Sequence, residues 1–143
     1  MIKLSFTYTD YNGVERTEDA YFHLSEEEIA DMELSEEGGF KAKLERLSKS
    51  IDVPEINEIF RFMIKKSYGV KSADGRRFSK KPEYFEEFTE TPAYSQLVMK
   101  CLEDVEYALN FLAGIMPKKL SNDEMNSIRS ELKTKGLTTD VKT

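Results

Sequence analysis

The amino-acid sequence predicts an α+β fold that is mostly α-helical, in which an N-terminal β-hairpin is followed by a compact multi-helix domain. Apolar and polar residues alternate at the start of the chain, and apolar residues then recur at helical spacing in several consecutive segments. A length of 143 residues suits one hydrophobic core. We expect one domain over residues 1–117, with the hairpin at 1–23 and the helices at 24–117, and then a C-terminal helix and a partly disordered tail at 118–143.

The hairpin is predicted from an alternating run and a turn. Four apolar residues alternate with polar ones, as in a half-buried strand: Ile2, Leu4, Phe6 and Tyr8. Asn12 and Gly13 supply the positive φ angles that a tight turn requires, and a second strand follows from about Val14 to Phe22. Two strands alone are only marginally stable in water, so we expect their apolar face to pack on helices.

The first helices are predicted from a capping pattern and from apolar stripes. Ser25 and Glu28 form a capping box, in which each side chain accepts a hydrogen bond from the other residue's main chain. The helix that follows ends near the glycines at 38–39 and has a narrow apolar edge: Ile29, Met32 and Leu34. Helical spacing predicts another helix at 40–51. The next helix begins near Pro54, ends near Gly69 as a C′ residue, and has the clearest stripe: Ile56, Ile59, Phe60, Met63 and Ile64.

Turn and capping residues divide the rest of the chain into three more helices. Asp74 and Gly75 mark a turn. Three positions suit helix starts: Pro82, Thr91 with Pro92, and Asp104. The helix after Thr91 has the stripe Tyr94, Leu97, Val98, Cys101 and Leu102. The helix after Asp104 stops at Pro117 and has the stripe Val105, Ala108, Leu109, Leu112 and Met116.

Composition and motifs exclude several classes of function. No apolar run approaches the roughly 20 residues of a membrane span, and the N-terminus has no signal-peptide pattern, so we expect a cytoplasmic protein. A single cysteine, Cys101, and a single histidine, His23, exclude an internal disulfide and a His/Cys metal site. The chain has no Gly-rich phosphate loop, zinc-binding helix or nucleophile elbow. We therefore expect neither enzyme activity nor a cofactor.

A basic stretch at 65–81 interrupts a chain whose net charge is −6. It contains one acidic residue and seven basic ones: Lys65, Lys66, Lys71, Arg76, Arg77, Lys80 and Lys81. Cations interleaved with Tyr68 and Phe78 are typical of a nucleic-acid contact loop, where aromatic rings stack on bases. The pI near 5.0 and the absence of a recognition motif favour a connector that contacts acidic protein surfaces instead.

Four segments together resemble the small tail assembly chaperones of long-tailed bacteriophages. They are KSYGVKSADGRRF at 66–78, YFEEF at 84–88, TPAYSQL at 91–97 and ALNFLAGIMP at 108–117. The resemblance extends from about Phe22 to Pro117, and it contains no catalytic residue.

The resemblance implies a non-enzymatic role in the cytoplasm of the host bacterium. Such chaperones bind the long, largely helical tape measure protein and keep it soluble until tail-tube subunits polymerise around it. The implied partner is the tape measure protein; the tail tube protein and further copies of the chain are candidate partners, and a membrane is not. A structural tail protein is the nearest alternative function. A nucleic-acid-binding regulator that uses residues 65–81 is the more distant one.

The predicted partner surface lies near the helix at 105–116. Beside its core stripe, this helix has a second apolar edge made of Tyr107, Phe111 and Ile115. Two apolar residues outside the other stripes, Phe62 and Met99, extend this candidate surface. The five residues would line a groove for amphipathic segments of the tape measure protein. The alternative is burial of the edge, because helices that are apolar nearly all round are usually internal.

Overall fold

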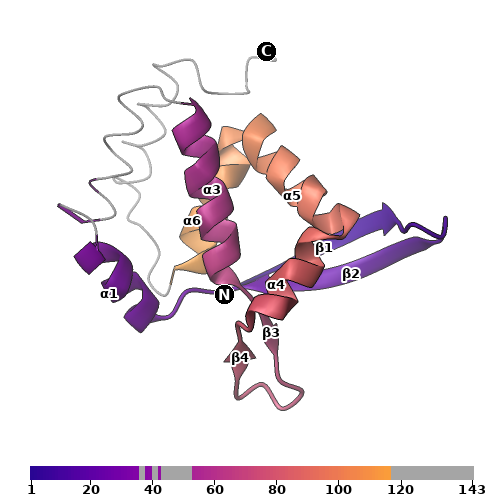
Figure 1. Ribbon diagram of the computed structural model, residues 1–143, viewed down its shortest axis with the longest axis horizontal. Coiled ribbons are helices and arrows are strands. Elements are labelled where there is room, and N and C mark those ends of the chain that lie inside the picture. Colours follow the sequence, from indigo (N-terminus) through magenta and orange to yellow (C-terminus); the bar gives the residue numbers. More distant parts are fainter. Residues whose placement is uncertain (36–37, 40–41, 43–52, 117–143) are drawn as a thin grey trace.

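A computed structural model describes residues 1–35, 38–39, 42 and 53–116 of the chain (Figure 1). Apart from residue 42, the helix expected at 40–51 lies outside the described residues, and so does the helix expected after residue 118. Among the described residues, 55% are helical and 22% lie in strands, which confirms the mostly helical α+β fold. The elements are β1 (Ile2–Thr9), β2 (Glu15–Phe22), α1 (Glu26–Ser35), α3 (Val53–Ser67), β3 (Tyr68–Lys71), β4 (Phe78–Ser79), α4 (Pro82–Thr89), α5 (Pro92–Glu103) and α6 (Val105–Ile115).

The N-terminal hairpin forms as the alternation predicts. β1 and β2 pair antiparallel from Ile2 opposite Phe22 to Thr9 opposite Glu15. The even-numbered side chains of β1 point to the core, and the odd-numbered ones are exposed. On the exposed face, the hydroxyls of Thr7 and Thr17 form a hydrogen bond of 2.9 Å across the strands. Because one face is polar and the other apolar, a shift of one residue in register would expose the apolar side chains.

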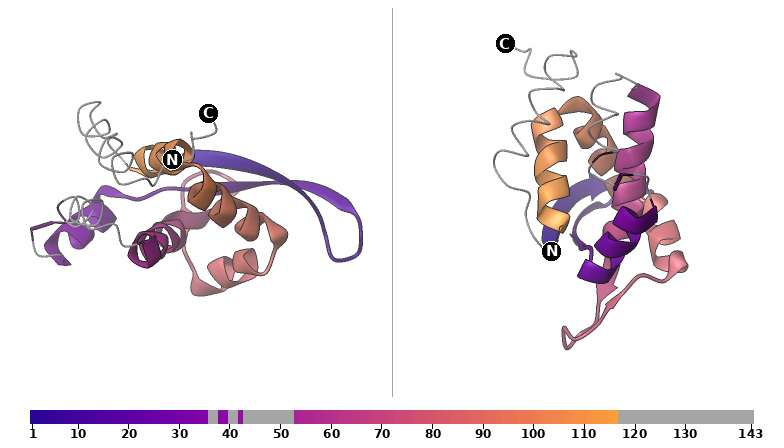
Figure 2. Two further views of the ribbon diagram at one scale, coloured as in Figure 1. Left: turned by 90° about the horizontal axis from the view of Figure 1, so that it is seen from above. Right: turned by 90° about the vertical axis from the view of Figure 1, so that its left-hand side faces the viewer.

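The hairpin also belongs to a larger sheet, which the sequence did not predict. The sheet has four strands in the order β1-β2-β3-β4, all antiparallel. β3 pairs with β2 only at Tyr21 and Phe22, and it then continues with β4 away from β2. Figures 1 and 2 show the β1–β2 hairpin and the β3–β4 hairpin projecting from the helices in different directions.

Gly69 does not end α3 as a C′ residue, because α3 ends at Ser67 and Gly69 lies inside β3 opposite Tyr21. The reason for a glycine here is a close approach between strands. A Cβ atom at position 69 would lie 2.6 Å from the ring of Phe78, which is closer than two non-bonded carbon atoms come in proteins. By contrast, the turn predicted at Asp74 and Gly75 is confirmed: it joins β3 to β4, with Gly75 at a φ of 78°.

The predicted capping residues are found at the helix starts. Ser25 and Glu28 make both hydrogen bonds of the capping box at the start of α1, at 2.9 and 3.1 Å. Asp104 accepts a hydrogen bond from the main chain of Tyr107 at the start of α6. Thr91 occupies the N-cap of α5, but its hydroxyl donates to the Phe88 carbonyl and so joins α4 to α5.

An aromatic cluster lies where the sheet meets the helices. Phe22 is fully buried and contacts the rings of Tyr68, Phe88 and Phe111, with centroids 5.3 to 6.0 Å away. The rings of Tyr68 and Phe88 stack at 4.4 Å. α5 and α6 pack on β1, and α4 packs on β3, so the hairpin does pack on helices as expected. β2, β3, α4 and α6 each contribute a ring to the cluster around Phe22, which fixes their relative positions.

Candidate partner-binding surfaces

The structure divides the five predicted partner-binding residues into two groups. Phe111 and Ile115 are 2% and 0% exposed, so these two residues of the α6 edge are buried. Tyr107 is half-buried on the same helix, and the Lys100 ammonium lies over its ring at 5.4 Å. Phe111 contacts the central ring of Phe22. Neither Phe111 nor Ile115 can contact a partner unless α6 moves away from the core.

Phe62 and Met99 are exposed, at 44% and 47% of their surface. Leu102 is also 41% exposed, although its spacing placed it in the core stripe of α5. It lies in the last turn of α5, three residues after Met99, and residues three apart are neighbours on a helix surface. Met99 and Leu102 thus form an exposed apolar strip that sequence spacing alone did not reveal.

Phe62 and Met99 belong to two helices that pack on each other. α3 contacts α5, and the Arg61 guanidinium reaches the Tyr94 hydroxyl at 3.4 Å. Phe62 follows Arg61 by 100° around α3, and its side chain is partly exposed. Met99 lies on the outer side of α5, opposite the buried residues Leu97 and Cys101. The structure brings the two helices together and leaves both side chains partly exposed on them.

Lys80, from the basic stretch, is a structural residue. Its ammonium donates to the Glu28 carboxylate at 2.6 Å, to the His23 carbonyl at 2.7 Å and to the Lys66 carbonyl at 2.9 Å. These contacts join the segment after β4 to α1, α3 and the end of β2. Burial alone would raise the pKa of Glu28, but the hydrogen bonds from Lys80 and Ser25 outweigh it, and the pKa of Glu28 is lowered overall.

Three other cations of the basic stretch lie on the β3–β4 hairpin. Lys71 lies over the ring of Tyr21 at 4.7 Å, whereas Arg76 and Arg77 are exposed beside the turn. The Tyr68 ring stacks on Phe88 in the core, so its face is not free to stack on a base. This placement argues against the nucleic-acid alternative, which needs cations and accessible rings on one surface.

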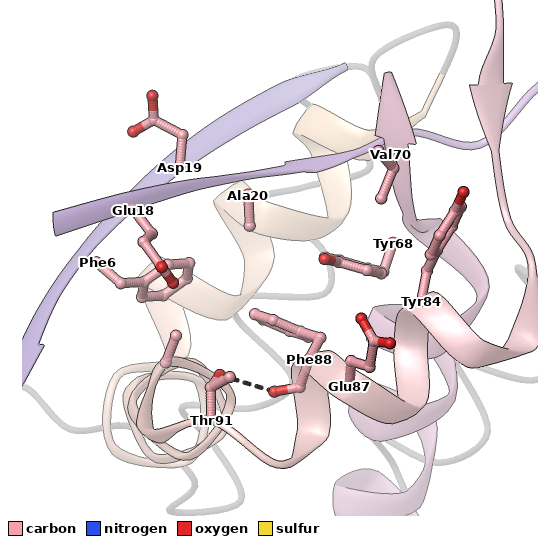
Figure 3. Close-up of a pocket in the computed structure, with 11 residues that line it drawn as sticks. Phe6, Glu18, Asp19, Ala20, Tyr68, Val70, Tyr84, Glu87, Phe88 and Thr91 are labelled. Carbon is pink, nitrogen blue, oxygen red and sulfur yellow. Dashed lines mark hydrogen bonds between the residues drawn. The ribbon is translucent and has the colours of Figure 1, made fainter. Parts of the chain in front are cut away.

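A pocket of about 210 Å³ lies between β2, β3 and α4 (Figure 3). Its floor is apolar and includes Phe6, Ala20 and Phe88. The carboxylates of Glu18 and Glu87 border it from opposite sides, and the Tyr68 hydroxyl points into it. Burial, together with the negative charges of Glu87 and Glu18, raises the pKa of Tyr68. The pocket therefore combines an apolar floor with a negative electrostatic potential.

The described residues contain no group of three or more acidic, histidine or cysteine side chains that could hold a metal ion. Burial raises the pKa of the Cys101 thiol to about 12, so this thiol is protonated and unreactive at neutral pH. Burial likewise lowers the pKa of His23, which favours a neutral imidazole. None of the helices in the described part is long and apolar enough to cross a membrane.

Comparison with known protein families identifies the class of protein. A family model described as phage tail assembly chaperone matches residues 1–142. The chain therefore belongs to the family of phage tail assembly chaperones, as the four sequence segments indicated. No curated protein and no solved structure matches it.

Proposed function

We propose that this chain is a non-enzymatic chaperone that binds the tape measure protein of its phage and keeps it soluble in the host cytoplasm during tail assembly. The observation that carries the proposal is the family match over residues 1–142. A tape measure protein is long and helix-rich, so before the tail tube surrounds it, its apolar helix faces are in contact with water. A chaperone that covers these faces would prevent their aggregation.

We further propose that residues 1–117 form the binding domain and that α3 and α5 provide the contact. Phe62, Met99 and Leu102 are large apolar side chains exposed on these helices. An aromatic ring and a flexible methionine suit a partner that presents many similar but non-identical helix faces. An indirect role remains for Tyr107, Phe111 and Ile115, because their packing would hold α6 against α3 and α5.

The double variant Phe62→Ala, Met99→Ala is expected to bind the tape measure protein about 30-fold more weakly, which corresponds to about 2 kcal/mol. Aromatic anchors carry a large share of such binding energy, and both side chains are accessible in the free chain. The measurement is the dissociation constant for a purified helical fragment of the tape measure protein, together with the melting temperature of the variant.

The matched control is Leu34→Ala, because Leu34 is 85% exposed but lies on α1. This control should bind as the unchanged chain does. If the control loses as much affinity as the double variant, or if the double variant binds normally while folded, the contact does not lie on α3 and α5.

A further inference from the structure

The outer edge of β2 has main-chain groups that no described strand pairs. The Asp10 N–H donates to the Val14 carbonyl at 2.8 Å, which fixes the pattern of the antiparallel ladder. Because this pattern repeats every two residues, Arg16, Glu18 and Ala20 direct their N–H and C=O groups to β1. The odd-numbered residues of β2 direct theirs to the opposite edge. The pairing of Tyr21 with Gly69 on that edge agrees with this assignment.

β3 covers only the end of this edge. It pairs with β2 at Tyr21 and Phe22 and then continues with β4. The stretch of β2 from Glu15 to Ala20 is therefore not paired with β3. Among the residues that the structure describes, no hydrogen bond reaches the main chain of Thr17 or Asp19 from this side. The free stretch is about 20 Å long, at about 3.3 Å per strand residue. The edge of β1 differs, because the Gln96 side chain already donates to the Thr7 carbonyl there.

The acidic pocket lies beside this free edge. Ala20 points into the pocket from β2, and Glu18 borders it from the same strand (Figure 3). Glu87 borders it from α4, and the Asp19 carboxylate projects from the other face of β2. α4 and the residue after it carry four acidic residues and no basic one within 82–90: Glu83, Glu86, Glu87 and Glu90. The single cation on this part of β2, Arg16, pairs with Asp10 at 2.6 Å and lies 3.6 Å from the Glu18 carboxylate, whereas no ion pair among the described residues involves Glu87.

We propose that this edge is a β-augmentation site, at which an extended segment of a protein partner that carries lysine or arginine adds a strand to β2. The free N–H and C=O groups of Thr17 and Asp19 would bond to the main chain of that segment. An apolar side chain of the segment enters the pocket over Ala20 and Phe88. Basic side chains two residues before and after it point to the same face and meet Glu18 and Glu87.

The charge beside the pocket selects this occupant. A nucleic acid or another acidic segment would be repelled by the carboxylates on both sides of the pocket. An uncharged strand would gain the main-chain bonds but would partly desolvate the Glu87 carboxylate, for which the described residues provide no ion-pair partner. The pocket includes Ala93 from the first turn of α5 but none of Phe62, Met99 and Leu102, so the proposal does not depend on which tail protein binds those side chains.

The test uses NMR titration of the full chain with a capped seven-residue peptide, Thr-Lys-Thr-Val-Thr-Lys-Thr, whose central valine and two lysines point to one face of a strand. The amide signals of Thr17 and Asp19 should shift, and those on the outer edge of β1 should not. Thr17→Pro removes an outward N–H without touching the ladder to β1, and an edge strand tolerates proline in this position. It should weaken peptide binding about tenfold or more. Thr17→Val is its matched control, since it loses the same hydroxyl contact to Thr7 but keeps the N–H.

A second pair of variants tests the charge without changing β2. Glu87→Lys should weaken binding of the lysine peptide severalfold and reduce its salt dependence, whereas Glu86→Lys, with the same change in net charge outside the pocket, should do so less. Three results would overturn the proposal. These are equal binding by Thr17→Pro and Thr17→Val, signal shifts confined to β1, or a dimer of the chain that Thr17→Pro dissociates.

Discussion

Replacing Phe111 by alanine is expected to lower the free energy of unfolding by about 3 to 5 kcal/mol. The Phe111 side chain is almost completely buried, and its ring contacts that of Phe22 at 5.3 Å and 73°. The substitution leaves a cavity where α6 meets the sheet, and the surrounding rings cannot close it without moving β3 or α4. The change can be measured by chemical denaturation and as a drop in melting temperature.

The control for this prediction is the same substitution at Phe62. Because Phe62 is partly exposed on α3, Phe62→Ala should cost about 1 kcal/mol or less. The two variants together decide which aromatic residues are core and which are surface. If Phe111→Ala were as stable as Phe62→Ala and instead lost partner binding, the aromatic edge of α6 would be a contact surface after all.

Replacing Lys80 by methionine is expected to cost about 2 to 3 kcal/mol of stability, although lysine is usually a tolerant surface residue. The methionine keeps much of the side-chain volume but cannot donate to the Glu28 carboxylate or to the His23 and Lys66 carbonyls. Those three acceptors would then be partly buried without this donor. Lys81→Met is the matched control, because Lys81 is exposed, and its effect should be small.

The penalty at Lys80 should also depend on pH. The pKa of Glu28 in the folded chain is lower than its ordinary value of 4.5, so its ion pair stabilises the fold above that value. This contribution is lost as the pH falls through the lowered pKa, because the carboxyl becomes protonated. The difference in unfolding free energy between the unchanged chain and Lys80→Met should therefore shrink below about pH 4.5. A penalty that grows on acidification would contradict the ion pair.

Local patterns in the sequence predicted the hairpin and most helix starts. The capping box of Ser25 and the cap at Asp104 depend only on residues three positions apart, so they can be recognised without the fold. The β3–β4 hairpin could not be predicted in the same way. β3 is four residues long, and it becomes a strand because Gly69 pairs with Tyr21, which lies far away in the sequence.

Which apolar residues are exposed could be predicted only in part, for a related reason. Helical spacing shows that α6 has two apolar edges, but it does not show that Phe22 lies against the second one. Leu102 fits the core stripe of α5 by spacing, yet it is 41% exposed in the last turn of the helix. The role of Lys80 depends on three acceptors from distant segments. Each of these features is set by tertiary contacts that no local pattern records.

The central claim, that the chain keeps the tape measure protein soluble, is tested most directly by co-expression of the two proteins in bacteria. The tape measure protein should be insoluble when expressed alone, and it should become soluble and co-purify with the chain when both are made. Phe62→Ala, Met99→Ala should reduce the soluble fraction, and Leu34→Ala should not. A tape measure protein that stays insoluble beside abundant folded chain, or a chain that is found as a component of purified phage particles, would contradict the account.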